Sequence, residues 1–334
     1  MKKKKYFLVF LVVILVILAY VYKTNDYPVT STFRSKLKSK PEITILPKKT
    51  EGSEIETKTI PATDQPDPRV FQKAESLLKA GRTEEALKIY NDLALKYPGH
   101  ELSARALIKT GGVCEQKGHI SRAISAYQKI QAEYPQIKFA FPTQAKLEKL
   151  RFKLLFSSAQ QEGCVFYNVE YGDSLAKIAR RFGTTVGLIK KINRMNKDVI
   201  QVGQRLKICK IKFNLHIDKS LNIMQFKSGD DVWKTYSVST GLDNSTPAGV
   251  FKIETKLIDP PWYRQGVVIP ASSPENALGS RWLGFNLKGY GIHGTIEPET
   301  IGKQITNGCV RMLNKDVEEL FDLVPKGTEV TIVD

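Results

Sequence analysis

The stretch HGTIEPETIGKQITNGCVRM, residues 293–312, places one histidine and one cysteine on either side of a short loop that contains glycine. A free thiol has a pKa near about 8.5 and reacts only as the thiolate, so a catalytic cysteine needs a neighbouring imidazole or another positive group. His293 is the candidate base and Cys309 the candidate nucleophile. Gly308 allows a backbone conformation closed to other residues. The N–H groups of Gly308 and Cys309, together with Asn307, are therefore the candidate oxyanion donors.

An isolated cysteine and histidine are also compatible with a buried packing thiol and a hydrogen-bonded turn histidine. The surrounding sequence favours a catalytic role for the two residues, because it resembles the L,D-transpeptidase family of the YkuD type. The motif of that family joins His-Gly-Thr to Ser-His-Gly-Cys-(Ile/Val)-Arg. Cys309 follows His293 by 16 positions, a separation that the shorter members share. The resemblance covers roughly residues 211–334. Its blocks are VSTGLDNSTPAGVFKI (238–253), PPWYRQGVVIPASSPENALGSRWLGF (260–285) and YGIHGT (290–295).

This resemblance implies a role for each residue of the motif. It implies that Cys309 is the acyl-accepting nucleophile and His293 the general base. The orienting member of the family's constellation is the residue after the histidine, here Gly294, which can act only through its backbone carbonyl. Arg311 matches the family's arginine and is expected to bind a carboxylate of an anionic peptide stem, unless it is simply a surface arginine near the site. Trp282, within the second block, is expected among the substrate-binding residues.

One position departs from the family pattern. Where most members have Ser-His-Gly-Cys, this chain has Thr306-Asn307-Gly308-Cys309. Asn307 can donate and accept hydrogen bonds but cannot carry charge. If the usual histidine helps to stabilise the thiolate, the thiol here is less acidic or depends more on His293 and Arg311. An inactive enzyme is the alternative.

The charge of the chain restricts its partners. The 334 residues include 51 Lys and Arg against 34 Asp and Glu, a formal net charge of +17. Such an excess is typical of proteins that meet nucleic acid, anionic lipid or a polyanionic wall. The sequence contains no helix-turn-helix, zinc-finger or aromatic RNA-binding signature, so an anionic cell-wall polymer is the simpler partner.

The amino terminus predicts export. Lys2 to Lys5 form a basic cluster, and YFLVFLVVILVILAYVY (6–22) is an uncharged apolar run at the short end of what spans a bilayer. No small-residue cleavage site follows it, so an uncleaved signal anchor with the lysines inside is expected. Cleavage at an unrecognised site is the alternative. Residues 23–66, rich in Lys, Thr, Pro and Glu, are expected to form a disordered linker.

A helical repeat follows the linker. AGRTEEALKIYNDLALKYP (80–98) aligns with KGHISRAISAYQKIQAEYP (117–135) at an offset of 37 positions. Ala86 matches Ala123 and Tyr90 matches Tyr127, a small and large alternation that resembles tetratricopeptide-type helical hairpins, whose usual period is about 34. Such an array can present a groove to a protein partner or act as a rigid spacer.

The segment CVFYNVEYGDSLAKIARRFGTTVGLIKKINRMNKDVIQVGQRLKIC (164–209) predicts a strand, two helices and a second strand. It resembles a LysM domain over its whole length, and family members bind N-acetylglucosamine-containing glycan. The resemblance maps that site onto Gly172, Asp173, Ser174 and Asn193, although the same residue types also serve as helix caps and turns. The antiparallel strands would bring Cys164 beside Cys209, so a disulfide between them is a hypothesis that suits an exported protein.

The expected fold class is multi-domain α+β, with an N-terminal transmembrane helix, an α-helical repeat region, a small βααβ LysM domain and a β-rich catalytic domain. Alternating residues in 211–226 predict a hairpin that turns near 218–220, and a helix is expected from 315 to 323 with Asn314 as a plausible N-cap. The expected parts are a basic cytoplasmic end (1–5), a signal anchor (6–22), a linker (23–66), helical repeats (67–158), a LysM domain (163–210) and a catalytic domain (211–334).

The function that this resemblance implies is a peptidoglycan L,D-transpeptidase, active in cell-wall biogenesis and cell shape, that uses Cys and His to form 3–3 cross-links through a thioester. An L,D-carboxypeptidase, a protein-anchoring enzyme of the same family, a catalytically silent wall-binding scaffold and an unrelated cysteine peptidase are the alternatives. Peptidoglycan is the expected partner, with a protein partner possible at the helical repeats and no nucleic acid. No cofactor or metal is expected, because the His and Cys residues lack zinc spacing. The enzyme is expected at the cell membrane with its catalytic part exported.

Overall fold

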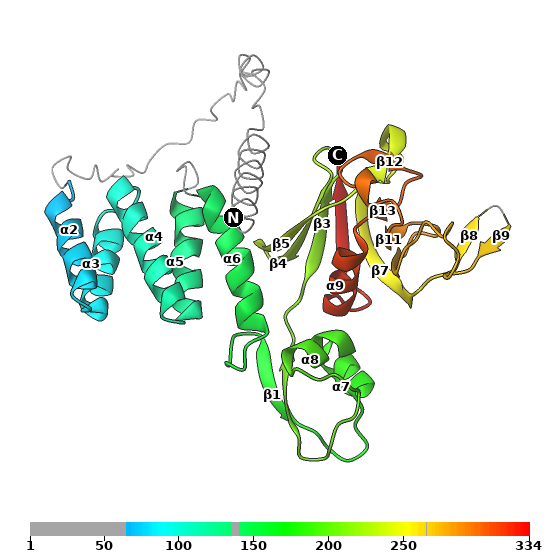
Figure 1. Cartoon of the computed structure of the whole chain (residues 1–334), viewed down its shortest axis with the longest axis horizontal. Helices are drawn as coiled ribbons and strands as arrows, with labels where there is room; N and C mark the ends of the chain where they lie inside the picture. Colours follow the sequence, from blue (N-terminus) through cyan, green and yellow to red (C-terminus); the bar gives the residue numbers. More distant parts are fainter. Residues whose placement is uncertain (1–64, 135–139, 265) are drawn as a thin grey trace, which may run out of the picture. The chain divides into compact units, whose positions relative to one another are not determined.

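A computed structural model describes residues 65–134, 140–264 and 266–334, which form a helical region, a small mixed region and a β-rich region (Figure 1). The expected membrane anchor at 6–22 and nearly all of the expected linker lie outside these residues. Within the described ranges, no helix combines the length and the apolar character needed to cross a membrane.

The helical region consists of successive helices, each packed on the next (Figure 1). They are α2 (Pro68–Lys79), α3 (Thr83–Lys96), α4 (Glu101–Gln116), α5 (Ile120–Glu133) and α6 (Ala140–Leu155). The predicted repeat is visible in α3 and α5, which begin 37 positions apart. Ala86 and Ala123 are fully buried where helices cross, while Tyr90 and Tyr127 fill the space beside them. Small residues at crossings and large ones between them explain the pairing of these helices.

The small mixed region has the predicted βααβ order. Its elements are β1 (Cys164–Asn168), α7 (Leu175–Phe182), α8 (Val186–Ile192) and β2 (Arg205–Cys209). Strands β1 and β2 are antiparallel, with Cys164 opposite Cys209. A disulfide joins these two cysteines, so the predicted pairing is confirmed. Gly183 ends α7 in a left-handed conformation, with φ +64°, which favours glycine.

The β-rich region is built on an eight-stranded sheet in the order β13-β11-β10-β7-β14-β3-β4-β5. Its strands are β3 (Asn214–Asp218), β4 (Ile223–Ser228), β5 (Asp231–Ser237), β7 (Gly249–Ile258), β10 (Arg281–Phe285), β11 (Gly291–His293), β13 (Val310–Arg311) and β14 (Glu329–Val333). The predicted hairpin is β3–β4. The fold also contains two small sheets, one of β6 (Thr240–Gly241) with β12 (Gln304–Thr306), the other of β8 (Trp262–Arg264) with β9 (Val267–Ile269). Two short 3-10 helices, η2 (Leu242–Asn244) and η3 (Pro298–Thr300), complete it.

Helix α9 (Asn314–Leu323) follows β13 and covers one face of this sheet. Val317, Leu320 and Leu323 are fully buried against sheet residues, a spacing of three that places them on one side of the helix. The prediction that Asn314 is the N-cap is wrong. Leu313 holds the cap position without a side-chain cap bond, and Asn314 is the first helical residue. Its amide is instead bonded to Thr295.

Candidate active site

Two short strands bring the predicted nucleophile and base to one face of the sheet. Strand β11 runs parallel to β13, with Ile292 beside Val310 and His293 beside Arg311. Ile292 and Val310 are fully buried in the core. Because successive side chains of a strand point to opposite faces, His293 and Arg311 lie on the other face. Cys309, directly before β13, is on the same face as these two residues.

The imidazole of His293 is buried and held in one orientation. His293 is only 4% exposed, and its Nδ1 lies 2.6 Å from the carbonyl oxygen of Gly294. A carbonyl can only accept, so Nδ1 carries the proton and Nε2 is left with its lone pair. The Trp282 ring stacks on the imidazole, with centroids 6.1 Å apart. This is the geometry expected of a general base oriented by a neighbouring carbonyl.

Burial keeps this imidazole neutral. The pKa of His293 is lowered to about 4, chiefly by desolvation and also by the positive charge of Arg311, although the hydrogen bond to the Gly294 carbonyl opposes both effects. At neutral pH the side chain is therefore in its basic form.

Cys309 is partly exposed at the edge of a cavity of about 270 Å³. Its thiol donates to the carbonyl oxygen of Gly289 at 3.4 Å. Burial raises the pKa of the Cys309 thiol, while a backbone hydrogen bond from Gly291 lowers it in part. The resting site therefore pairs a thiol with a neutral imidazole. The cavity is otherwise lined by Leu257, Pro260, Pro261, Trp262, Tyr263, Leu278, Trp282 and Gly289.

Trp282, expected among the substrate-binding residues, lines the same cavity as Cys309. The cavity lining also includes residues of the 258–278 segment, whose β8–β9 hairpin was not predicted. Among the described residues, no three His, Cys, Asp or Glu side chains lie together in a way that could hold a metal ion.

The turn before Cys309 is tightly constrained. Gly308 has φ +112°, and a Cβ at this position would lie 2.8 Å from the Tyr290 ring. The N–H of Gly308 donates to the Thr306 hydroxyl at 3.2 Å, and that hydroxyl donates to the Cys309 carbonyl at 2.6 Å. The Gly308 amide is thus already bonded within the turn, which does not support its predicted use as an oxyanion donor. Asn307 is exposed on the same turn.

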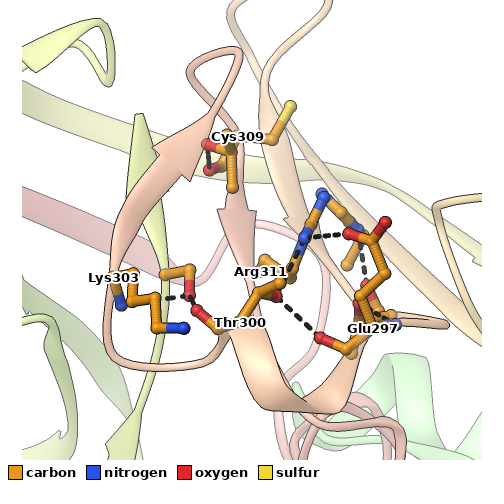
Figure 2. Close-up of polar contacts among 10 residues, drawn as sticks. Glu297, Thr300, Lys303, Cys309 and Arg311 are labelled. Carbon is orange, nitrogen blue, oxygen red and sulfur yellow. Dashed lines mark hydrogen bonds and ion pairs between the residues drawn. The ribbon is translucent and has the colours of Figure 1, made fainter. Parts of the chain in front are cut away.

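Arg311 is bonded inside the protein. Its Nη1 donates to the Glu297 carboxylate at 2.8 Å and to the Thr300 hydroxyl at 2.9 Å, as Figure 2 shows. The arginine side chain is only 12% exposed, whereas the Glu297 side chain is 52% exposed. A substrate carboxylate would therefore compete with Glu297 for Nη1 of Arg311. Local sequence patterns do not predict this pairing, because the two residues are 14 positions apart.

The residues predicted for glycan binding are engaged within the small region. Gly172 has φ +81° and forms the turn. The Asp173 carboxylate accepts from the Tyr167 hydroxyl at 2.7 Å and from the Glu170 amide at 2.9 Å. Ser174 caps α7 by accepting from the Lys177 amide at 3.2 Å. The turn and cap roles thus account for the polar groups of this loop.

Asn193 directly follows α8 in the same region. Its amide nitrogen donates to the carbonyls of Ile189 and Lys207, and its oxygen accepts from the Lys207 amide, each at 2.8 Å. This side chain joins α8 to β2. Tyr171, which sequence reasoning missed, is 97% exposed beside Gly172 and is the free ring on this loop.

Comparison with known proteins agrees with this geometry. Profiles match the L,D-transpeptidase catalytic domain at residues 213–332, the LysM domain at 167–208 and a tetratricopeptide repeat at 70–100. A Bacillus subtilis protein named as an L,D-transpeptidase, YqjB, is 43% identical over 124 residues, which cover 35% of this chain and 69% of that protein. A second from the same organism, YkuD, is 31% identical over 173 residues, covering 50% of this chain and 97% of its own length.

Among solved structures, the L,D-transpeptidase from Mycobacterium smegmatis is 18% identical with a TM-score of 0.31, and the match covers 40% of this chain and 65% of that one. The family assignment rests on the sequence matches, since the match to YkuD covers nearly the whole of that protein at 31% identity. The chain belongs to the L,D-transpeptidase family with a YkuD-type catalytic domain, and it carries a LysM domain and a tetratricopeptide-type repeat.

Proposed function

We propose that this protein is a peptidoglycan L,D-transpeptidase that forms 3–3 cross-links between tetrapeptide stems through a Cys309 thioester. The observation that carries the proposal is the state of His293: buried, neutral and with Nδ1 bonded to the Gly294 carbonyl. Its Nε2 is on the same face of the sheet as Cys309, and Cys309 lines a mostly apolar cavity of about 270 Å³.

In the first half of the reaction, His293 Nε2 takes the proton of the Cys309 thiol as the sulfur attacks the carbonyl carbon of the third stem residue. The carbonyl oxygen becomes an oxyanion, for which the Cys309 N–H is the nearest predicted donor. When the tetrahedral intermediate collapses, the C–N bond breaks and His293 gives its proton to the departing D-alanine amine. A thioester on Cys309 remains.

In the second half, an acceptor replaces the sulfur. The side-chain amine of a diamino acid on another stem attacks the thioester carbonyl, His293 takes a proton from it, and the thiolate leaves to be reprotonated. Water in place of the amine would make the protein an L,D-carboxypeptidase, and a protein amine would make it an anchoring enzyme. The mostly apolar lining of the cavity, with Trp262, Tyr263 and Trp282, supports an enzyme that limits access of water.

The other regions would bring the enzyme to its substrate. The LysM domain would hold the glycan strand while the catalytic domain acts on its stem, and Tyr171 is the side chain best exposed to stack on a sugar. The apolar run at 6–22 would anchor the chain at the cell membrane, with the catalytic part on the wall side.

The proposal is tested by incubating the full chain with disaccharide-tetrapeptide and analysing products and protein by mass spectrometry. We expect an acyl adduct on Cys309 and cross-linked dimer. Cys309→Ala should abolish both, and His293→Ala should slow turnover about 10²–10⁴-fold. His216→Ala, a histidine within β3, is the matched control and should keep full activity. Tripeptide without dimer would indicate a carboxypeptidase, and the absence of any adduct would leave only a wall-binding scaffold.

A further inference from the structure

One peptide group lies between His293 and a side chain that the proposed chemistry does not use. The carbonyl that accepts from His293 Nδ1 belongs to the peptide bond joining Gly294 to Thr295. The N–H of that same peptide, on Thr295, donates to Asn314 Oδ1 at 3.0 Å. In a planar trans peptide the C=O and N–H point in opposite directions, so a bond that fixes the N–H also fixes the direction of the carbonyl.

Asn314 also bonds to neighbouring peptide groups. Its Nδ2 donates to the Thr295 carbonyl at 2.8 Å, and its Oδ1 also accepts from the Ser280 amide at 3.2 Å. The packing is close on both neighbouring glycines. A Cβ at Gly294 would lie 2.0 Å from Asn314 Oδ1, and one at Gly279 would lie 2.3 Å from it. The side chain thus joins the segment after His293 to Ser280, directly before β10, and to the start of α9.

We propose that Asn314 is a positioning residue that sets the tautomer and direction of the His293 imidazole through the Gly294–Thr295 peptide. The connected groups are Nδ1–H of His293, the peptide C=O and N–H, and the side-chain carbonyl of Asn314. This inference rests on the proposed role of His293 as the base. It explains why a neutral carbonyl suffices as the orienting group: its direction is held by a second bond rather than by a charge.

Hydrogen-bond physics supports the connection. A hydrogen bond to an amide N–H polarises the same amide's carbonyl and makes that oxygen a better acceptor, an effect that is stronger in a low-dielectric interior. Gly294 and Thr295 are both buried. Without Asn314, the Thr295 N–H would lose its partner, and the Gly294–Thr295 peptide would be free to rotate toward another. The Nδ1 proton of His293 would then lose its fixed acceptor.

The test uses histidine labelled with ¹⁵N, because the whole chain has four histidines and the signals can be assigned by substitution. In the full-length wild type we expect Nδ1 of His293 protonated and Nε2 unprotonated. Asn314→Ala should give a mixture of tautomers. It should also lower kcat about 10- to 100-fold on disaccharide-tetrapeptide with KM within about 2-fold, since misplaced catalytic groups lower the rate of the chemical step more than binding.

Asn314→Asp is the rescue variant. Its Oδ1 still accepts from the Thr295 and Ser280 amides, so it should restore the wild-type tautomer and most of kcat even if the lost donor lowers the melting temperature. Asn286→Ala is the matched control, because Asn286 Oδ1 also accepts a backbone N–H, from Lys252 at 2.9 Å, elsewhere in the sheet. This control should change neither the tautomer nor kcat.

A wild-type tautomer in Asn314→Ala would overturn the inference, whatever happens to the melting temperature, and so would an altered tautomer with unchanged kcat. Failure of the proposed function is a separate result. If the wild-type protein were inactive, or if His293→Ala kept its turnover, the proposed function would fail. The NMR signals would still report whether Asn314 sets the tautomer of the His293 imidazole.

Discussion

At the residue scale, the candidate site differs from a thiolate–imidazolium pair. Burial lowers the pKa of His293 and raises that of Cys309, so both side chains are uncharged in the free protein at neutral pH. The low-dielectric surroundings penalise each charged form. The thiol proton therefore has to move during the attack on the substrate rather than before it, which makes the orientation of Nε2 decisive.

This difference predicts an acid-tolerant enzyme. The base form of His293 is lost only as the pH falls through about 4, whereas an ordinary histidine loses it near about 6.5. We expect kcat/KM to stay nearly constant from pH 7 down to pH 5 and to decline below that. A pH–rate profile measures this. An acid limb centred near pH 6.5 would contradict a buried neutral base.

The same pKa affects stability. His293 binds a proton more weakly in the folded state than in the unfolded state, so it stabilises the fold fully above about pH 6.5, and this contribution is lost as the pH falls toward about 4. Denaturant unfolding at pH 7 and pH 5 should show the difference. His293→Gln, which does not titrate, should reduce it.

The Arg311–Glu297 pair gives a second prediction, with two variants that act in opposite directions. Arg311 lowers the pKa of His293, so Arg311→Gln should move the acid limb to higher pH. Glu297→Gln leaves the Arg311 charge uncompensated and should move the limb to lower pH. The measurement is the pH–rate profile of both variants at low ionic strength, where screening is weak. Equal shifts in one direction would show that the pair acts through structure instead of charge.

Much of the site could be predicted from local sequence. The motif predicts Cys309 as the nucleophile and His293 as the base. It also predicts Gly294 as the orienting group, because that group is the residue after the histidine. The Gly308 amide was predicted as an oxyanion donor, whereas it donates to the Thr306 hydroxyl two residues away. The Glu297 partner of Arg311 and the contacts of Asn314 could not be predicted. Each depends on a contact across space, as between Ser280 and Asn314, whose separation along the chain carries no periodic signal.

At the element scale, the disulfide is expected to determine the stability of the LysM region. Its core is small, and the bond between Cys164 and Cys209 closes a loop of 45 positions. Closing such a loop removes entropy from the unfolded chain and stabilises a domain by about 2–4 kcal/mol. We expect Cys164→Ser with Cys209→Ser to increase proteolysis within residues 164–209, measured by limited digestion and mass spectrometry.

Reduction of the wild type with dithiothreitol should reproduce this effect, and Cys114→Ser is the control because that thiol is buried in the helical region and unpaired. An unchanged digestion pattern after complete reduction would mean that the core of this region needs no cross-link.

The elements themselves were largely predictable where the pattern repeats or alternates. The alanine and tyrosine positions of α3 and α5, and the hairpin β3–β4, follow directly from periodicity. The β8–β9 hairpin could not be predicted in this way, since its strands have only three residues each and lie in a segment rich in proline. Asn314 was mistaken for a cap because asparagine before a helix usually is one.

At the scale of the whole molecule, the net charge of +17 should contribute to binding of the wall. Attraction between exposed charges extends about 10 Å at 0.1 M salt and about 3 Å at 1 M. We therefore expect co-sedimentation of the full chain with sacculi that retain their anionic polymers to weaken over this range. Sacculi stripped of those polymers are the control and should show little salt dependence. Equal binding to both at all salt concentrations would exclude an electrostatic contribution.

The arrangement of the cysteines allows the protein to be quantified by thiol labelling. Two of its four cysteine thiols are joined in a disulfide and a third, Cys114, is buried among helices, so a mild thiol reagent has a single place to react. One equivalent of label taken up by native protein would then report the fraction of molecules with an intact nucleophile. A preparation could be standardised by this stoichiometry before any substrate is available.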